Sequence, residues 1–154
     1  MSLTAKRKTT GQSVVEIGIS VFLLIVLSLI ISNIFVISKA QAYNERICRD
    51  SILLAGKAAL DGNDSAKVFK AATAGMENCG MGGFFIRRPE YTIFSDDITK
   101  DTTERVLKIQ TKTKVLVPCP VLVFDAGLST NPILEVKTTY TYKIKNPKPF
   151  KSEK

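Results

Sequence analysis

The stretch Ile17–Ile37, IGISVFLLIVLSLIISNIFVI, contains 21 consecutive residues without a charge. A helix of this length measures about 31 Å, which is enough to cross a hydrocarbon core of about 30 Å. Its many β-branched residues do not argue against a helix, because lipid leaves the backbone no other way to satisfy its hydrogen bonds. We therefore predict a transmembrane helix over residues 12–38.

The charges that flank this stretch predict its orientation. Lys6, Arg7 and Lys8 precede it, and the first basic residue after it is Lys39. By the positive-inside rule the N-terminus stays in the cytoplasm and the rest of the chain is exported. A cleavable signal peptide is the alternative, since residues 40–42 read Ala-Gln-Ala, but the apolar region of a signal peptide usually has only about 7–15 residues.

The composition argues against most catalytic and nucleic-acid-binding classes. The chain has 154 residues, a formal charge of +8 and no His, so the commonest general base and metal ligand are missing. Three of the positive charges precede the apolar stretch, and several lysines lie in the basic tail at residues 147–154 or just before it. No nucleic-acid-binding motif accompanies them. We expect no enzymatic activity, no cofactor, no metal and no nucleic-acid partner.

Glu16 lies at the cytoplasmic edge of an otherwise apolar run that begins at Val14. An acidic side chain at this place is costly in lipid, and such residues are usually functional. Alternatively, Glu16 marks the headgroup boundary and neutralises the nearby basic cluster. The residues alone leave both interpretations open.

The stretch from Lys6 to Glu16, KRKTTGQSVVE, resembles the leader and start of type IV prepilin-like proteins, and most closely their TadE-like branch. The resemblance implies a leader at residues 1–11 that a prepilin peptidase removes after Gly11. Gln12 would then be the new N-terminus and Glu16 the fifth mature residue. Glycine suits such a site, because it lacks a Cβ and resists unwinding little. The resemblance also implies that Glu16 pairs with the α-amine of a neighbouring subunit during assembly.

The resemblance covers about residues 6–60 and extends beyond them only as general architecture. Family members often carry an aromatic residue after the Glu and a Pro about six residues later, where this chain has Ile17 and Phe22. The implied function is that of a minor pilin or pseudopilin in a tight-adherence (Flp-type) pilus or related secretion filament. The implied place is the bacterial inner membrane, and the implied partners are the lipid bilayer, other pilin subunits and the inner-membrane pilus assembly machinery. An uncleaved membrane-tethered extracytoplasmic binding domain is the alternative.

Residues 39–146 predict an extracytoplasmic α+β head that begins with a helical hairpin. Tyr43, Ile47, Leu54 and Ala58 recur at helical spacing, so the long helix continues beyond the membrane. The sequence Asp-Gly-Asn-Asp at 61–64 predicts a turn, and Asp64 or Ser65 can cap a second helix that ends near Glu77.

The second half of the head predicts an antiparallel sheet of about three strands, packed with its dry face on the helices. Tyr91–Phe94 is a short candidate strand, and Arg105–Val117 and Leu134–Lys145 alternate between apolar and polar residues. The apolar segment Pro118–Phe124 contains two prolines, which exclude it from a central strand. It fits a buried crossover, a lip on the membrane surface or a subunit contact.

Three cysteines in an exported domain predict one disulfide and one remaining thiol. A hairpin that turns near residues 62–63 places position 48 opposite position 77, which favours Cys48–Cys79, with Cys79–Cys119 as the second choice. The spacing does not fit paired zinc ligands. Four carboxylates of the second half, Asp96, Asp97, Asp101 and Glu104, are interpreted as an exposed acidic loop and not as an acid–base pair.

Overall fold

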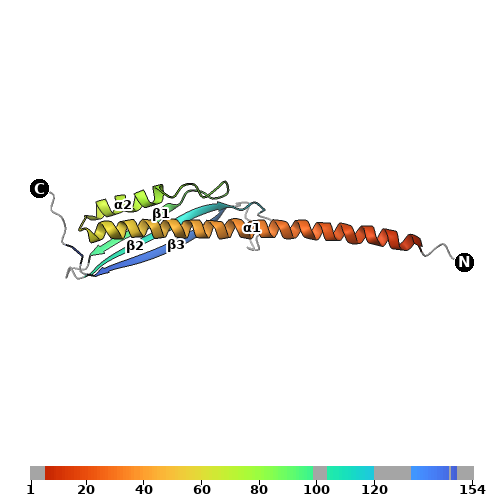
Figure 1. Ribbon diagram of the computed structural model, residues 1–154, viewed down its shortest axis with the longest axis horizontal. Helices are drawn as coiled ribbons and strands as arrows, with labels where there is room; N and C mark the ends of the chain where they lie inside the picture. The colour runs from red at the N-terminus through yellow and green to blue at the C-terminus, as the bar shows by residue number, and fades with distance from the viewer. Residues whose placement is uncertain (1–5, 99–103, 120–132, 146, 149–154) are drawn as a thin grey trace.

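The computed structural model describes residues 6–98, 104–119, 133–145 and 147–148. Two helices, α1 (Lys6–Leu60) and α2 (Ser65–Glu77), precede three strands, β1 (Glu90–Ile98), β2 (Glu104–Leu116) and β3 (Ile133–Lys145). The predicted α+β class is confirmed: a long apolar N-terminal helix continues into a helical hairpin, which packs on a three-stranded antiparallel sheet. In Figure 1, α1 runs along the whole molecule, and the other elements gather on its second half.

Helix α1 has 55 residues, which at the helical rise gives a rod about 82 Å long. It continues without a break because the chain has no proline before Pro89. The turn predicted at 61–64 follows its end, where Gly62 has a φ of 78°, in the left-handed region that glycine adopts without strain. The hairpin therefore folds back where the sequence predicts it.

Helix α2 begins and ends at the predicted residues. The Asp64 side chain accepts a hydrogen bond of 3.2 Å from the backbone N–H of Lys67, which caps the first turn. Near the other end, Gly75 lies so close to α1 that a Cβ on it would be 2.9 Å from the Cα of Ser51. The absence of a side chain at Gly75 thus lets the two helices touch.

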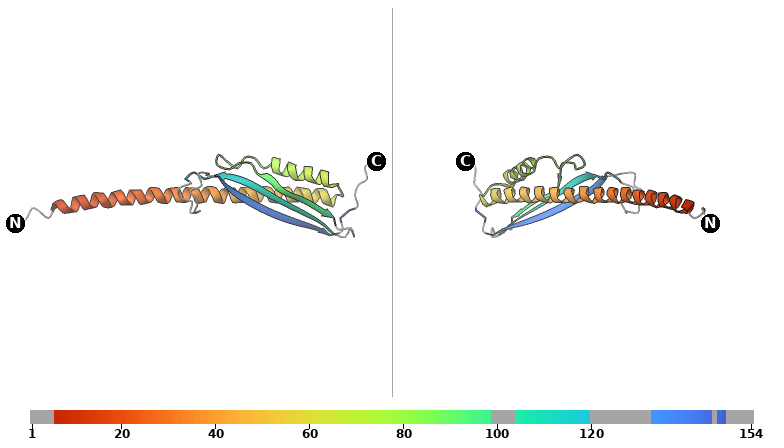
Figure 2. Two further views of the ribbon diagram at one scale, coloured as in Figure 1. Left: turned by 180° about the vertical axis from the view of Figure 1, so that it is seen from behind. Right: turned by 45° about the vertical axis from the view of Figure 1, so that its right-hand side comes forward.

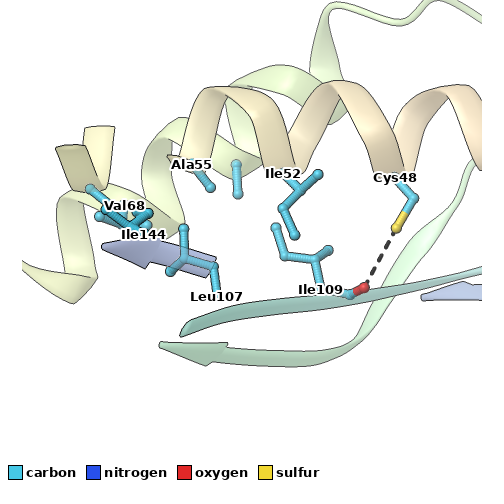
Figure 3. Packing of buried hydrophobic residues seen from close by; sticks show 9 residues of the cluster. Cys48, Ile52, Ala55, Val68, Leu107, Ile109 and Ile144 are labelled. Carbon is cyan, nitrogen blue, oxygen red and sulfur yellow. Dashed lines mark hydrogen bonds between the residues drawn. The ribbon is translucent and has the colours of Figure 1, made fainter. Parts of the chain in front are cut away.

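The sheet has the order β1-β2-β3, with both pairs antiparallel. Both helices cover one face of it: α1 lies over β2 and β3, and the Phe69 ring of α2 lies against Phe94 of β1. Figure 2 shows the opposite face of the sheet without a helix over it. The covered face of β2 carries the predicted Leu107, Ile109 and Val115, all fully buried. Leu107 and Ile109 pack on the small residues of α1 in the core shown in Figure 3. Val115 belongs to a second cluster with Ala40 of α1.

A buried ion pair joins the end of α1 and the turn after it to the sheet, at the end of the head farthest from the N-terminus. The Arg105 guanidinium donates to both carboxylate oxygens of Asp96, at 2.8 and 2.6 Å, and both side chains are almost fully buried. The same group donates to the backbone oxygens of Ala59 and Asn63. The acidic-loop interpretation is therefore wrong for Asp96, which belongs to β1 and neutralises a buried arginine; Asp101 lies outside the described residues.

Arg105→Met should destabilise the head strongly, because it leaves the Asp96 carboxylate buried without a cation and the end of α1 without a donor. We expect a loss of about 3–5 kcal/mol in the free energy of unfolding. The measurement is urea unfolding of the detergent-solubilised chain, followed by circular dichroism at pH 7.

The matched control is Lys112→Met, which removes the ion pair with Glu135 at 3.0 Å on the solvent side of the sheet. Solvent screens this pair, so its loss should be much smaller. Similar losses for both variants would contradict the special role of the buried arginine.

Candidate assembly site and its junction with the head

The first half of α1 leaves the head as a bare helix (Figure 1). From residue 13 to 32 its side chains are exposed or half-buried on every side, and Phe22 and Leu24 keep 65% and 67% of their surface. This half is long and apolar enough to cross a membrane. An apolar rod exposed all round is typical of a helix that lipid or other subunits cover.

The predicted processing and assembly residues all lie at the start of this bare half. Gly11 and Gln12 belong to the first turns of α1, and Glu16 follows one turn later with an exposed side chain. The hydroxyl of Ser20 donates to the backbone oxygen of Glu16 at 2.8 Å, so the helix is regular here. Because Gly11 lies inside a helix, a peptidase that cuts after it has to meet an unwound first turn, and glycine weakens the helix at that point.

Asn33, inside the stretch predicted to span the membrane, makes the first hydrogen bonds between α1 and the described part of the head. The Asn33 amide nitrogen donates to the Cys119 oxygen at 2.8 Å, and the Cys119 N–H donates to the Asn33 side-chain oxygen at 3.0 Å. Asn33 keeps only 4% of its surface, and Val36 and Ala40 pack on the sheet beyond it. The freely exposed part of α1 therefore ends at about Ser32.

Asn44 makes the next polar contact along the helix, and it is fully buried. Its amide nitrogen donates to the Thr138 hydroxyl at 2.9 Å, and its oxygen accepts from the Thr113 hydroxyl at 2.8 Å. A buried amide with satisfied partners allows one arrangement, because any shift along the strand leaves a polar group unpaired. Asn33 and Asn44 together fix the sheet relative to the bare half of α1.

The three cysteines are free thiols. Cys48 is buried against the sheet, with Sγ 3.5 Å from the Ile109 oxygen (Figure 3), whereas the Cys79 Sγ lies 3.6 Å from an Asp50 carboxylate oxygen. The predicted Cys48–Cys79 disulfide is not formed in the structure. The hairpin arithmetic predicts how far along α1 each residue lies, but it does not predict the side of α1 that each faces. Cys48 faces the sheet, whereas α2 lies against another face of α1. Cys119 lies at the level of Asn33, far from Cys79.

The cysteines and carboxylates of the described residues form no metal-binding group. Within them, no group of three His, Cys, Asp or Glu side chains could hold a metal ion. Partial burial raises the pKa of the Cys79 thiol, and the hydrogen bond to the Asp50 carboxylate and its charge raise that pKa further. A raised pKa keeps this thiol protonated and weakly nucleophilic.

No protein-family model, curated protein or solved structure matches this chain.

Sequence reasoning missed the residues that position the head. The apolar alternation of β2 does not reveal that its buried face also carries Arg105, Thr111 and Thr113. The sequence could have pointed to Asn33, because this residue carries the only amide side chain in the uncharged stretch. A lone amide in an apolar helix usually has a partner, and here the partner is the backbone of Cys119.

Asn33→Leu should loosen the junction, because it leaves the Cys119 N–H and carbonyl without their partner. We expect amide hydrogen exchange at Cys119 to accelerate up to about tenfold, which corresponds to one lost hydrogen bond. Ser32→Leu, at an exposed neighbouring position, is the control and should leave this exchange unchanged. Equal exchange in Asn33→Leu and the unmodified chain would show that the contact does not hold the junction.

Asp50→Asn should lower the pKa of Cys79, because it removes the carboxylate that favours the protonated thiol. The alkylation rate of Cys79 by iodoacetamide should then rise at lower pH than in the unmodified chain. Peptide mass spectrometry measures the rate at each cysteine, and Cys119, far from Asp50, provides the internal control. An unshifted pH profile at Cys79 would refute the contact.

Proposed function

We propose that this chain is a minor pilin or pseudopilin subunit that takes part in assembly of a tight-adherence (Flp-type) pilus or related secretion filament. The observation that carries the proposal is the division of α1 into a bare apolar half and a half fixed in an α+β head (Figure 1). The leader-like sequence at residues 6–16 stands at the start of the bare half, where the proposed role requires it.

The bare half suits two successive environments. In the membrane its exposed side chains contact lipid, and in a filament the same side chains contact the corresponding helices of other subunits. Because α1 is continuous and the head is fixed to it at Asn33 and Asn44, the subunit can pass between these environments as one body. The head needs no refolding, and only the surroundings of the rod change.

The proposed maturation explains the basic and acidic residues near the start. Lys6, Arg7 and Lys8 keep the leader on the cytoplasmic side of the bacterial inner membrane, with the head outside the cytoplasm. A prepilin peptidase then cuts after Gly11 and releases the α-amine of Gln12. Glu16 and the amine of a neighbouring subunit form an ion pair that relieves the cost of each charge in lipid. The inner-membrane assembly machinery adds the subunit to the filament.

The intact mass and N-terminal sequence of the protein from its native membrane test the maturation step. We expect a chain that starts at Gln12, because the peptidase removes residues 1–11. A start at Tyr43 would indicate a secreted soluble domain instead. An intact N-terminus, in a cell that contains the peptidase, would contradict the proposal and favour an uncleaved, membrane-tethered binding domain.

Glu16→Ala should leave cleavage after Gly11 intact and lower incorporation into filaments at least several-fold. Glu16→Gln is the matched variant: it keeps the size and loses the charge, so it should behave like Glu16→Ala if the ion pair matters. The measurement is the amount of subunit in sheared filaments relative to the membrane fraction. Normal incorporation of both variants would exclude the pairing role.

A further inference from the structure

One end of the head faces the bare half of α1, and therefore the membrane that this half crosses. This end contains the end of β2, the beginning of β3 and the connection between α2 and β1 (Figure 1). The Asn33–Cys119 contact places it: Leu116 lies three residues before Cys119, about 10 Å along an extended chain. The headgroup layer on one side of a bilayer is about 5–7 Å thick, so this end of the head lies next to it.

The connection between α2 and β1 carries apolar side chains that nothing in the described part of the chain covers. Met81 is 100% exposed and Phe84 is 91% exposed. The connection is nevertheless held in place, since the Tyr43 hydroxyl donates to the Gly80 oxygen at 2.7 Å. A Cβ on Gly82 would lie 2.7 Å from the Tyr43 ring, so the loop packs closely on α1. Fixed apolar side chains at a membrane-facing end are typical of contact with lipid.

An open pocket of about 330 Å³ lies beside this loop. Lys114 and Leu116, which line it, belong to the less buried face of β2. Its two cationic side chains come from neighbouring segments, because the Arg87 N–H donates to the Lys114 oxygen at 2.8 Å. Two of its apolar side chains, Leu116 and Ile133, are paired across β2 and β3 and are each about half exposed. The volume is at the lower end of the range for small-ligand sites. The lining residues are Arg87, Glu90, Lys114, Val115, Leu116 and Ile133.

The two cations form no ion pair among the described residues, although Glu90 lies in the same pocket and Glu135 stands opposite Lys114 across β2 and β3. Arg87 and Lys114 form no ion pair with Glu90, whereas Lys112, on the same face of β2, is paired with Glu135 at 3.0 Å. The lining therefore keeps a net positive charge. A lining that combines a guanidinium, an ammonium and apolar side chains matches a ligand with a phosphate and a hydrocarbon part.

We propose that this pocket binds the headgroup of an anionic phospholipid from the leaflet that the head faces. Arg87 and Lys114 contact the phosphate, and Leu116 and Ile133 contact the glycerol and the first part of the acyl chains. Met81 and Phe84 rest on the lipid surface beside it. The inference depends on α1 crossing a membrane, but it does not depend on cleavage or filament assembly. The two proposals can therefore fail separately.

The test is native mass spectrometry of the full chain in detergent, titrated with phosphatidylglycerol or with phosphatidylcholine of the same acyl chains. We expect one phosphatidylglycerol to be retained at concentrations at which phosphatidylcholine is not. The double variant R87Q/K114Q should bind phosphatidylglycerol at least about tenfold more weakly, because it removes both phosphate contacts. Circular dichroism melting should remain unchanged, since the variant introduces no buried polar group.

The matched control is K108Q/K143Q, which removes the same charge from the same face of the sheet at its far end. It should bind phosphatidylglycerol as the unmodified chain does. An equal loss in both double variants would show general attraction to a basic surface and overturn the site, as would equal affinity for the two lipids. Glycerol 3-phosphate is the third ligand: if it binds as tightly as phosphatidylglycerol, the pocket takes soluble phosphates and the lipid assignment is wrong.

Discussion

The fixed register between α1 and β2 is the constraint on which the rest of the structure depends. The strand runs antiparallel to the helix, from Arg105 beside Ala59 to Cys119 beside Asn33. The extended chain from Arg105 to Cys119 is about 46 Å long, and the helix from Asn33 to Ala59 is about 39 Å long. The two lengths are compatible because the strand crosses the helix obliquely (Figure 1). Polar contacts at both ends and at Asn44 make any slip along this line costly, because each slip leaves several buried groups unpaired.

This register makes the molecule a rod with a rigidly attached head. Apolar packing alone would allow sliding, because the helix face that meets the sheet is built largely of small residues such as Ala40, Ala55 and Ala59. Small residues bring the backbone of α1 close to the sheet, but their side chains do not interlock with the sheet in a way that fixes the register. The polar contacts supply the specificity that alanines cannot, at the cost of burying groups that need partners.

Much of this fold follows from the sequence, because its signals are local. The uncharged stretch, the turn at 61–64, the Asp64 cap and the alternation of β2 each depend on neighbouring residues. The failures concern contacts between distant segments. From the sequence, Asp96 is interpreted as an exposed loop residue, whereas the sheet places it diagonally across from Arg105. Cys48 is interpreted as a partner of Cys79, whereas the sheet covers its side of the helix. Helical spacing predicts how far along the helix axis a residue lies, but only tertiary packing decides which element its side chain faces.

The junction at Asn33 also decides how deep Glu16 lies under the proposed placement in a membrane. Hydropathy alone allows the apolar stretch to shift along the membrane normal by a helical turn or more, which would bring Glu16 to the headgroups. With the head resting on one surface, Glu16 lies 17 residues from Asn33, or about 25 Å, within a hydrocarbon core of about 30 Å. The contact that fixes the head thus holds the carboxylate in the lipid. In the proposed assembly, the free amine of a neighbouring subunit would relieve the cost of this buried charge.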